Sequence, residues 1–259
     1  MEPDAVRCLT GISKTCIPID ETKYRSGVGE LLYLTVCTRP DITFAVNLCA
    51  RAVQCPQEVH HSAVKRILRY LKRDFSTGLV YKRVAKPFRL VVYSDSDYAN
   101  DRDDSKSTSG NIILLNGAPV SWRTSKQKAV STSTVEAEYI AACAAVKEVI
   151  WLQWLLTEIL GANNLLPPLL LMDSEGAEAV IKRKTTSSKT KHIRYSYHMI
   201  SDYYASKLID IKHVKGTENP ADALTKPLAK DKFDYYLQKM QVGTVKSSSR
   251  INNVSSNTC

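Results

Sequence analysis

The chain has 259 residues, 44% of them hydrophobic, which suffices for one large globular domain or two small ones. Its 36 basic and 26 acidic side chains leave a formal net charge of +10, which points to a polyanionic partner such as nucleic acid. Seven scattered cysteines without a C-x-x-C pair argue against a zinc site and against a disulfide framework. We see no secretory signal peptide and no apolar run near the roughly 20 residues of a membrane span, so we expect no membrane association.

The first 77 residues carry helical patterns and no predicted strand. After a leader over residues 1–23, we expect three helices, over about residues 24–36, 41–54 and 57–73. Residues 24–77 therefore form a small all-helical unit.

The third of these helices has a basic face. At about 100° per residue, five cations fall within an arc of roughly 120°, opposite an apolar face that includes Leu68. The cations are Lys65, Arg66, Arg69, Lys72 and Arg73. A solvated helix face would show the same pattern, but no acid in this stripe pairs with the cations, which suits binding to a phosphate backbone.

From Gly78 onward the hydrophobic period changes to that of strands, and residues 78–228 read as an α/β domain. Five extended segments come first, and Asn116-Gly117 is a hairpin signal between two of them. The segments are 79–82, 88–94, 109–115, 119–123 and 128–133. A long helix then runs over residues 134–160, with Ser133 and Glu136 as its capping box.

The last part of the chain alternates again between strands and helices. We expect strands over 169–172 and 209–214, helices over 174–183 and 193–207, and a helix followed by a disordered tail within 229–259. A second basic run contains no acid between Glu178 and Asp202, and we expect it to contact a phosphate backbone as well. Its members are Lys182, Arg183, Lys184, Lys189, Lys191 and Arg194.

Four carboxylates stand at the ends of predicted elements or inside the long helix. They are Asp95, Glu138, Asp173 and Asp222. Each one also fits a structural role, as a turn former, a helix cap or a solvated helix residue. If the four converge, they need a compensating cation, and a hard divalent ion such as Mg²⁺ prefers oxygen ligands. Two such ions about 4 Å apart would hold the attacking and leaving oxygens of a phosphodiester.

Several short stretches resemble a known family. They are Tyr93-Ser94-Asp95-Ser96-Asp97-Tyr98-Ala99, Asp104-Ser105-Lys106-Ser107-Thr108-Ser109-Gly110, Val120-Ser121-Trp122, Ser125-Lys126-Gln127-Lys128, Glu136-Ala137-Glu138-Tyr139-Ile140-Ala141 and Ala221-Asp222-Ala223-Leu224-Thr225-Lys226-Pro227. In this order they resemble the ribonuclease H domain of copia-type long-terminal-repeat retrotransposons. The helical unit is similar to the segment that joins reverse transcriptase to ribonuclease H in those Pol polyproteins, the polymerase thumb or connection.

The resemblance implies a ribonuclease H-like mixed five-stranded sheet with flanking helices, preceded by the all-helical unit. It implies a D-E-D-D site that uses two Mg²⁺ ions, for which Mn²⁺ could substitute, to hydrolyse the RNA strand of RNA–DNA hybrids. The site would consist of Asp95, Glu138, Asp173 and Asp222, with Asp97 and Ser174 in secondary roles. It also implies a C-terminal piece of a Pol polyprotein whose partners are nucleic acid and the rest of that polyprotein. Its location would be the cytoplasm, in the virus-like particle of an intact element, or the nucleus.

Glu136 and Glu138 lie roughly 200° apart around the predicted helix, so only one of them can face the site. Small or apolar residues follow Glu138 at the spacing that the family shows, so Glu136 is left as the cap. Asp97 shares the strand face of Asp95, since positions i and i+2 point the same way.

Two stretches depart from the family pattern. Val214-Lys215-Gly216 lacks a following histidine, which aids product release in cellular ribonucleases H, and Arg194 and Ser196 change two charged positions. We interpret His192 and His198 as structural or phosphate-near. The alternative function is an inactive or co-opted module that binds nucleic acid without cutting it. We set aside an integrase or transposase, because its glutamate would come last in the chain, and we find no Tyr-x-Asp-Asp polymerase signature.

Overall fold

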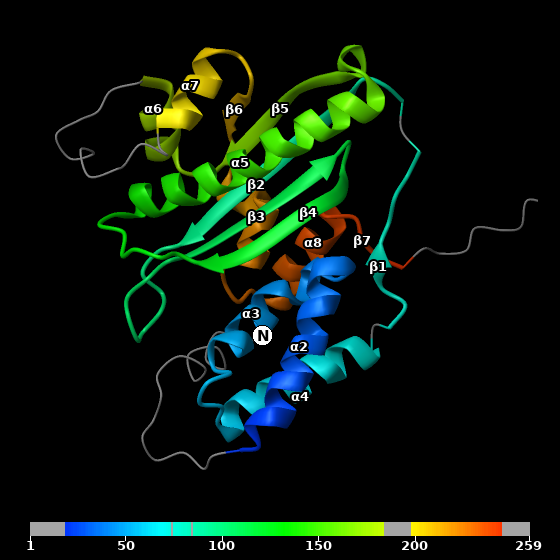
Figure 1. Ribbon diagram of the computed structural model, residues 1–259, viewed down its shortest axis with the longest axis vertical. Coiled ribbons are helices and arrows are strands. Elements are labelled where there is room, and N and C mark those ends of the chain that lie inside the picture. Colours follow the sequence, from blue (N-terminus) through cyan, green and yellow to red (C-terminus); the bar gives the residue numbers. More distant parts are fainter. Residues whose placement is uncertain (1–18, 74, 84, 184–197, 245–259) are drawn as a thin grey trace, which may run out of the picture.

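Three helices in the first part of the chain pack around a core of their own. In the computed structural model, residues 19–73, 75–83, 85–183 and 198–244 are described. The helices are α2 (Glu21–Cys37), α3 (Thr43–Arg51) and α4 (Glu58–Arg73), and a 3₁₀ turn over Pro40–Ile42 joins the first two (Figure 1). Apolar side chains such as Val28, Leu31 and Val46 fill the space between them. The expected all-helical unit is confirmed, although Leu68 is 51% exposed and does not lie on the buried face.

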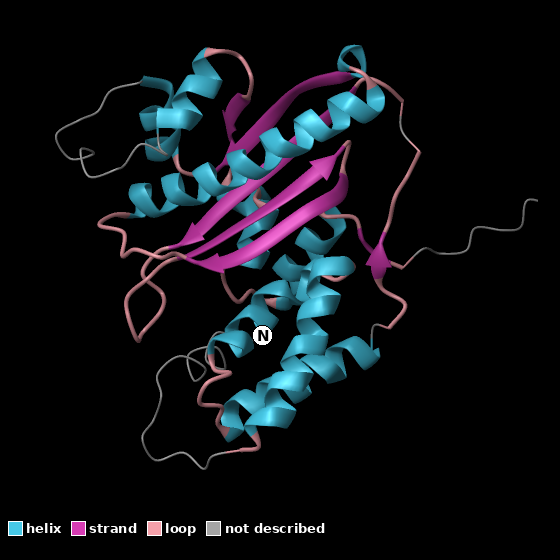
Figure 2. Ribbon diagram, viewed as in Figure 1, coloured by secondary structure: helices cyan, strands magenta, loops and turns pink. Residues whose placement is uncertain are grey.

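A mixed five-stranded sheet follows, as expected for a ribonuclease H-like fold. Its strands are β2 (Phe88–Asp97), β3 (Thr108–Leu115), β4 (Ala118–Lys126), β5 (Leu165–Met172) and β6 (Asp210–His213). The spatial order is β4-β3-β2-β5-β6. The β2–β3 and β3–β4 pairs are antiparallel, whereas β2–β5 and β5–β6 are parallel (Figure 2). The central strand β2 and its parallel neighbour β5 therefore end at the same edge of the sheet.

One face of the sheet is covered by α5 (Thr134–Leu160), α6 (Glu175–Arg183) and α7 (His198–Ala205) (Figure 1). The small residues of α5 let it lie close to the sheet, and its Ala142 and Val146 pack with Val92 and Leu170. By length and composition, α5 is the one described helix that could cross a membrane. Its buried face is part of the main core of the molecule, so here it serves as the helix that covers the sheet.

The other face carries the C-terminal segment and the helical unit. A 3₁₀ segment, Pro220–Leu224, and the helix α8 (Lys230–Lys239) pack on Ile112 and Leu114 of β3. Two short strands, β1 (Gly78–Leu79) and β7 (Val242–Gly243), pair with each other outside the main sheet. The helical unit docks here through polar contacts, such as Asn47 Nδ2, which donates to the carbonyl oxygen of Thr124 at 3.2 Å.

Several element predictions are wrong in detail. Of the segment 79–82, only Leu79 lies in a strand, the two-residue β1, and that strand lies outside the main sheet. The segment 128–133 is not a strand, because the side chains of Gln127 and Ser131 bond to each other and turn the chain into α5. Of the helix expected over 193–207, residues 198–207 fall in the described part of the chain, and His198–Ala205 are helical. The hairpin at Asn116-Gly117 is confirmed, with positive φ angles of 47° and 91°.

Strand β5 begins four residues earlier than expected, at Leu165 instead of Leu169. Two prolines, Pro167 and Pro168, lie within it and cannot donate to a ladder. The register between β2 and β5 shifts at this point, where Arg89 pairs with Leu166 and Val91 with Leu169. The irregularity lets the strand continue past the prolines.

Candidate active site

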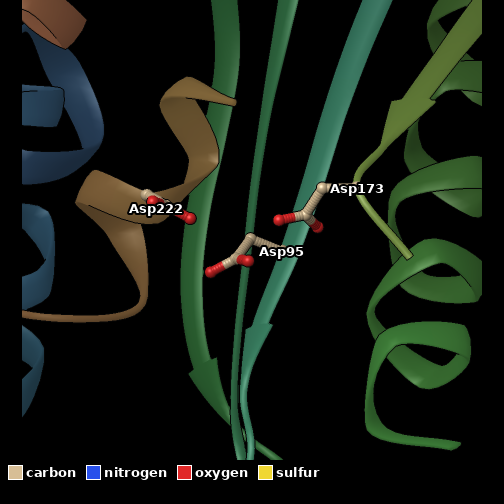
Figure 3. Close-up of side chains that lie close together, drawn as sticks. All are labelled: Asp95, Asp173 and Asp222. Carbon is tan, nitrogen blue, oxygen red and sulfur yellow. The ribbon is translucent and has the colours of Figure 1, made fainter. Parts of the chain in front are cut away.

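Three aspartates from distant parts of the sequence meet at the carboxyl ends of β2 and β5. Asp95 lies on β2, Asp173 follows β5 directly, and Asp222 lies in the 3₁₀ segment Pro220–Leu224. One carboxylate oxygen from each lies within 4.8 Å of the other two. Figure 3 shows the three side chains directed into the same space, with Asp95 between the other two. The parallel pairing of β2 and β5 explains why Asp95 and Asp173 share an edge.

The approach of Asp222 depends on a glycine. Gly110 pairs with Asp95 across the β2–β3 ladder, and it faces the segment that carries Asp222. A Cβ atom at Gly110 would lie 2.7 Å from Thr225 Cγ2 and 2.9 Å from Leu224 Cβ. The close packing is held by Thr124 Oγ1, which donates to the carbonyl oxygen of Leu224 at 2.7 Å.

Asn219 fixes the start of the same segment. Its amide nitrogen donates to the carbonyl oxygen of Ser94 at 2.9 Å, and its amide oxygen accepts from the backbone N–H of Ala221 at 3.2 Å. Because Ser94 precedes Asp95, this one buried side chain ties the strand and the loop together beside both aspartates.

Glu138 reaches the same place from α5. Its side chain is buried, and Oε1 accepts from the backbone N–H of Ser96 at 3.0 Å. The other oxygen, Oε2, is buried and has no hydrogen-bond partner. Burial, followed by the charges of Asp95 and Asp173, raises the pKa of Glu138 to about 9. Glu138 does not belong to the group of three aspartates whose oxygens lie within 4.8 Å of one another. It is nevertheless close enough for the charges of Asp95 and Asp173 to raise its pKa.

Glu136 has the capping role that the sequence suggested. Ser133 Oγ accepts from the backbone N–H of Glu136 at 3.1 Å, and Glu136 Oε2 accepts from the N–H and hydroxyl of Thr132 at 2.6 and 2.7 Å. The glutamate thus reaches back one residue beyond the N-cap.

Gln127 joins the two halves of the site and was not identified from the sequence. Its buried amide nitrogen donates to Ser109 Oγ at 2.8 Å, to the carbonyl oxygen of Ala137 at 2.9 Å and to Ser96 Oγ at 3.3 Å. Ser96 follows Asp95 and Ala137 precedes Glu138. The glutamine therefore links β2 to α5 next to both carboxylates.

Two lysines compensate the aspartates, and they too were missed. Lys226 Nζ lies 2.9 Å from Asp222 Oδ1 and 3.6 Å from Asp95 Oδ2, and Lys232 Nζ lies 2.7 Å from Asp222 Oδ2. Thr225 donates from its hydroxyl to Asp95 Oδ2, and the Tyr236 hydroxyl donates to Asp222 Oδ2 at 3.2 Å. The spacing of four residues between Asp222 and Lys226 was visible in the sequence, but that pairing is common and did not single it out.

Burial and crowding perturb the aspartates. The pKa of Asp95 is raised to about 7, mainly by burial; the charge of Lys226 and the Thr225 hydroxyl oppose this rise, and the charges of Asp222 and Asp173 contribute to it. Burial also raises the pKa of Asp173, with the charge of Asp222 as the next cause. Strongly perturbed carboxylates that share a site are a common feature of catalytic and metal centres.

The two residues given secondary roles lie beside this group. Asp97 ends β2, and its Oδ2 accepts from the side-chain amide of Asn100. Ser174 Oγ accepts from the backbone N–H of Ala177 at 3.2 Å, so it caps α6. Because Ser174 caps α6, the carboxylate of the preceding Asp173 is not needed as a helix cap and can face the site.

The loop after β6 lies directly against the site. A Cβ atom at Gly216 would lie 3.0 Å from Asp173 Oδ2, so a side chain at this position would press on that carboxylate. Tyr236 of α8 donates to the Gly216 carbonyl oxygen at 2.9 Å. The stretch that lacks the family histidine is therefore a short 3₁₀ turn, Gly216–Glu218, packed between Asp173 and α8.

The predicted nucleic-acid contacts fall into two groups. All five cations of the stripe on α4 are exposed, and three of them, Arg66, Arg69 and Arg73, line a cleft of about 820 Å³ between α4 and the start of α8. In the second run, Lys182 forms an ion pair with Glu178 and lies over the Tyr204 ring, which reduces its free charge. Arg183 is exposed at the end of α6. The remaining residues, Lys184, Lys189, Lys191, His192, Arg194 and Ser196, lie outside the described part of the chain.

The chain matches no family model. It is 40% identical over 229 residues to the retrovirus-related Pol polyprotein from transposon RE1 of Arabidopsis thaliana, covering 88% of this chain and 15% of that polyprotein. It is 39% identical over 211 residues to the Pol polyprotein from transposon TNT 1-94 of Nicotiana tabacum, covering 82% of this chain and 16% of that one. The chain thus spans only about a sixth of the curated relatives that it matches over most of its own length.

Among solved structures, the chain is similar to a ribonuclease H1 isolated from compost, with 16% identity and a TM-score of 0.41. That match covers 57% of this chain and 98% of the other. The matches to the polyproteins cover 88% and 82% of this chain. The chain therefore belongs to the family of retrovirus-related Pol polyproteins of copia-type transposons.

Proposed function

We propose that this chain is a metal-dependent endonuclease of the ribonuclease H type, which hydrolyses the RNA strand of RNA–DNA hybrids during retrotransposon reverse transcription. The observation that carries the proposal is the convergence of Asp95, Asp173 and Asp222 within 4.8 Å, beside the buried Glu138. Crowded carboxylates of this kind are costly unless cations compensate them. In an intact element the chain would act beside the rest of the Pol polyprotein, in cytoplasmic particles or the nucleus.

The donor set fits divalent magnesium. All four groups are carboxylates, which are the ligands that Mg²⁺ prefers, and Glu138 Oε2 is a buried acceptor without a partner. Bound at these residues, a pair of Mg²⁺ ions would stabilise the charge that develops on a phosphodiester during hydrolysis. The protein's own part is to hold the carboxylates in place, and Gln127 and Asn219 do this through buried hydrogen bonds to the backbone next to them.

A cleavage assay on a labelled hybrid tests the proposal. The chain is incubated with an RNA–DNA hybrid, with duplex DNA and with single-stranded RNA, each in Mg²⁺ and in excess chelator. We expect cleavage of the RNA strand of the hybrid in Mg²⁺ alone, and loss of that cleavage in Asp95→Asn. Tight hybrid binding without cleavage in either Mg²⁺ or Mn²⁺ would favour the alternative, a module that binds nucleic acid without cutting it.

The stripe on α4 supplies the proposed grip on the substrate. Three of its exposed cations, Arg66, Arg69 and Arg73, line the cleft at the start of α8, and α8 also carries Lys232, which contacts Asp222. A duplex held at the carboxylates would therefore meet the stripe along its backbone. Such contacts bind phosphates and carry no sequence preference.

We expect the triple variant Lys65→Glu, Arg69→Glu and Lys72→Glu to weaken hybrid binding strongly at low salt and little at high salt. The log–log salt slope should fall by roughly 0.9 for each phosphate that the variant no longer neutralises. Lys147→Glu on the exposed side of α5 is a control for a general change of charge. A salt slope that the triple variant leaves unchanged would show that the stripe is only a solvated helix face.

A further inference from the structure

Lys226 bridges two of the three aspartates, and the positive charge at the site lies on one side. Its ammonium group contacts Asp222 and Asp95, and the ammonium of Lys232 contacts Asp222. In the part of the chain that the structure describes, neither Asp173 nor Glu138 forms an ion pair. The four carboxylates therefore divide into an Asp95–Asp222 side that lysines occupy and an Asp173–Glu138 side that they do not.

Building on the proposed function, in which these carboxylates hold divalent ions, we propose that Lys226 competes with one of two ions for Asp95 and Asp222. The lysine thereby sets the concentration of divalent ion that the site needs. An ammonium group and a divalent ion at the same carboxylate repel each other over a few ångströms, where the medium screens charges less than water does. The lysine must move away, or the ion must bind more weakly.

Lys226 can make way without disturbing the fold. Its side chain is 34% exposed and ends a flexible four-carbon stem, so the ammonium group can swing towards solvent. Its backbone N–H donates to the carbonyl oxygen of Asp222 at 3.1 Å, and this bond does not depend on the side chain. Exchange therefore breaks two ion pairs and leaves the 3₁₀ segment in place.

On the Asp173–Glu138 side, no lysine among the described residues competes with a cation for the carboxylates. Glu138 Oε2 is buried without a partner, and its glutamate feels the charges of both Asp95 and Asp173. A cation that binds there gains an acceptor and displaces no ammonium group. The structure therefore predicts two unequal ion sites, of which the weaker one is the one that Lys226 contests.

Lys232 is a less direct competitor. It contacts Asp222 alone, and its ammonium group also lies 5.3 Å from the centre of the Tyr236 ring. Removing it would leave Asp222 bonded to Lys226 and to the Tyr236 hydroxyl. Lys226→Met is therefore the informative substitution.

Calorimetric titration of the whole chain with Mn²⁺, and separately with Mg²⁺, without nucleic acid, tests the proposal. We expect two binding events in the wild type. In Lys226→Met, the dissociation constant of the weaker event should fall roughly tenfold, the effect of one partly screened charge, while the tighter one changes less than about twofold. Lys230→Met removes the same charge four residues away, at the start of α8, and should leave both events unchanged.

Three results would contradict the proposed competition. The first is a weaker binding event whose dissociation constant does not change in Lys226→Met. The others are an equal gain in affinity in Lys230→Met, and an equal gain in affinity for both binding events in Lys226→Met. Should Lys226→Met melt at a much lower temperature than the wild type, Lys226→Gln, which keeps a polar end, takes its place. Two-ion binding that ignores Lys226 would leave the proposed function standing. A wild type that binds no divalent ion and cuts no hybrid would instead remove the proposed function itself.

Discussion

Two buried aspartates of this molecule, Asp41 and Asp95, differ in the charges that surround them. Asp41 lies in the turn between α2 and α3, where the Arg39 guanidinium donates to both of its oxygens at 2.7 to 3.2 Å and the Tyr70 hydroxyl donates at 2.7 Å. Asp95 lies beside Asp173 and Asp222, with a single lysine at 3.6 Å. The first carboxylate has one cation of its own, and the second shares its cation with other carboxylates.

The difference separates a structural ion pair from a chemical site. A buried carboxylate that is fully matched by a guanidinium and a hydroxyl holds a turn in place, and nothing remains for a ligand to satisfy. A group of carboxylates with too few cations is destabilising by itself, and a divalent ion relieves that repulsion. Substitutions at the two places should therefore have opposite consequences for stability and for activity.

The largest expected effect is on cleavage. Asp95→Asn keeps the shape of the side chain and removes one negative charge from the site. We expect cleavage of a hybrid to fall roughly a thousandfold or more, because bound metal ions supply several kcal/mol of transition-state stabilisation. Thermal melting without divalent ion should show unchanged or higher stability, since the substitution relieves repulsion among the aspartates. Strong destabilisation by Asp95→Asn would contradict the view that this carboxylate is under-compensated.

The opposite result is expected at Asp41. Asp41→Asn leaves the positive charge of Arg39 buried without the carboxylate that balances it, which should cost about 3–5 kcal/mol of unfolding free energy. Chemical denaturation measures this loss, and the folded fraction should still cut the hybrid. Glu21→Gln breaks the exposed pair with Arg25 in the same helical unit and should cost less than about 1 kcal/mol. Equal costs for the two variants would show that burial does not distinguish these ion pairs.

Sequence patterns could locate most elements but not the contacts that complete the site. The bounds of α5 agree with the structure because a capping box and a following glycine mark its ends. The segment 128–133 was misread because its conformation depends on Gln127, whose partners lie on β2, β3 and α5. Local periodicity carries no information about such partners.

The four carboxylates were predicted as site residues from the family resemblance, supported by their places at the ends of elements. Their convergence follows from the parallel pairing of β2 with β5 and from the space that Gly110 leaves for the segment of Asp222. Lys226 and Lys232 were not nominated, because a lysine near an aspartate is ordinary in sequence. Only the folded chain shows that these two lysines contact two of the three aspartates, Asp95 and Asp222.

A smaller effect should appear in the dependence of stability on pH. Burial and neighbouring charges raise the pKa of Asp95 to about 7 and that of Glu138 to about 9, from ordinary values of 3.8 and 4.5. The folded chain then holds protons that the unfolded chain releases, so this stability is present below the ordinary values and is lost as pH rises towards about 9. Without divalent ion, the melting temperature should fall between about pH 5 and pH 9, by roughly 2–4 °C for each kcal/mol lost.

Added Mg²⁺ should raise the melting temperature more at the upper end of that range than at the lower end. Ion binding requires ionised carboxylates, which are more populated at high pH. Asp95→Asn should flatten the pH dependence. If Mg²⁺ raised the melting temperature equally at about pH 5 and about pH 9, these carboxyl groups would not titrate as their burial suggests.

The smallest expected effect is that of Glu136, which lies two positions before Glu138 on α5. Glu136→Ala removes a half-buried carboxylate that accepts hydrogen bonds from Thr132, so it should cost about 1 kcal/mol of unfolding free energy, as other lost caps do, and leave cleavage intact. Glu138→Ala removes the buried carboxylate that faces Asp95 and should abolish cleavage while the fold persists. Denaturation and hybrid cleavage are measured on both variants in parallel. Equal loss of cleavage in both variants would refute the assignment of Glu138 to the site, because only one of the two positions can face Asp95 on a regular helix.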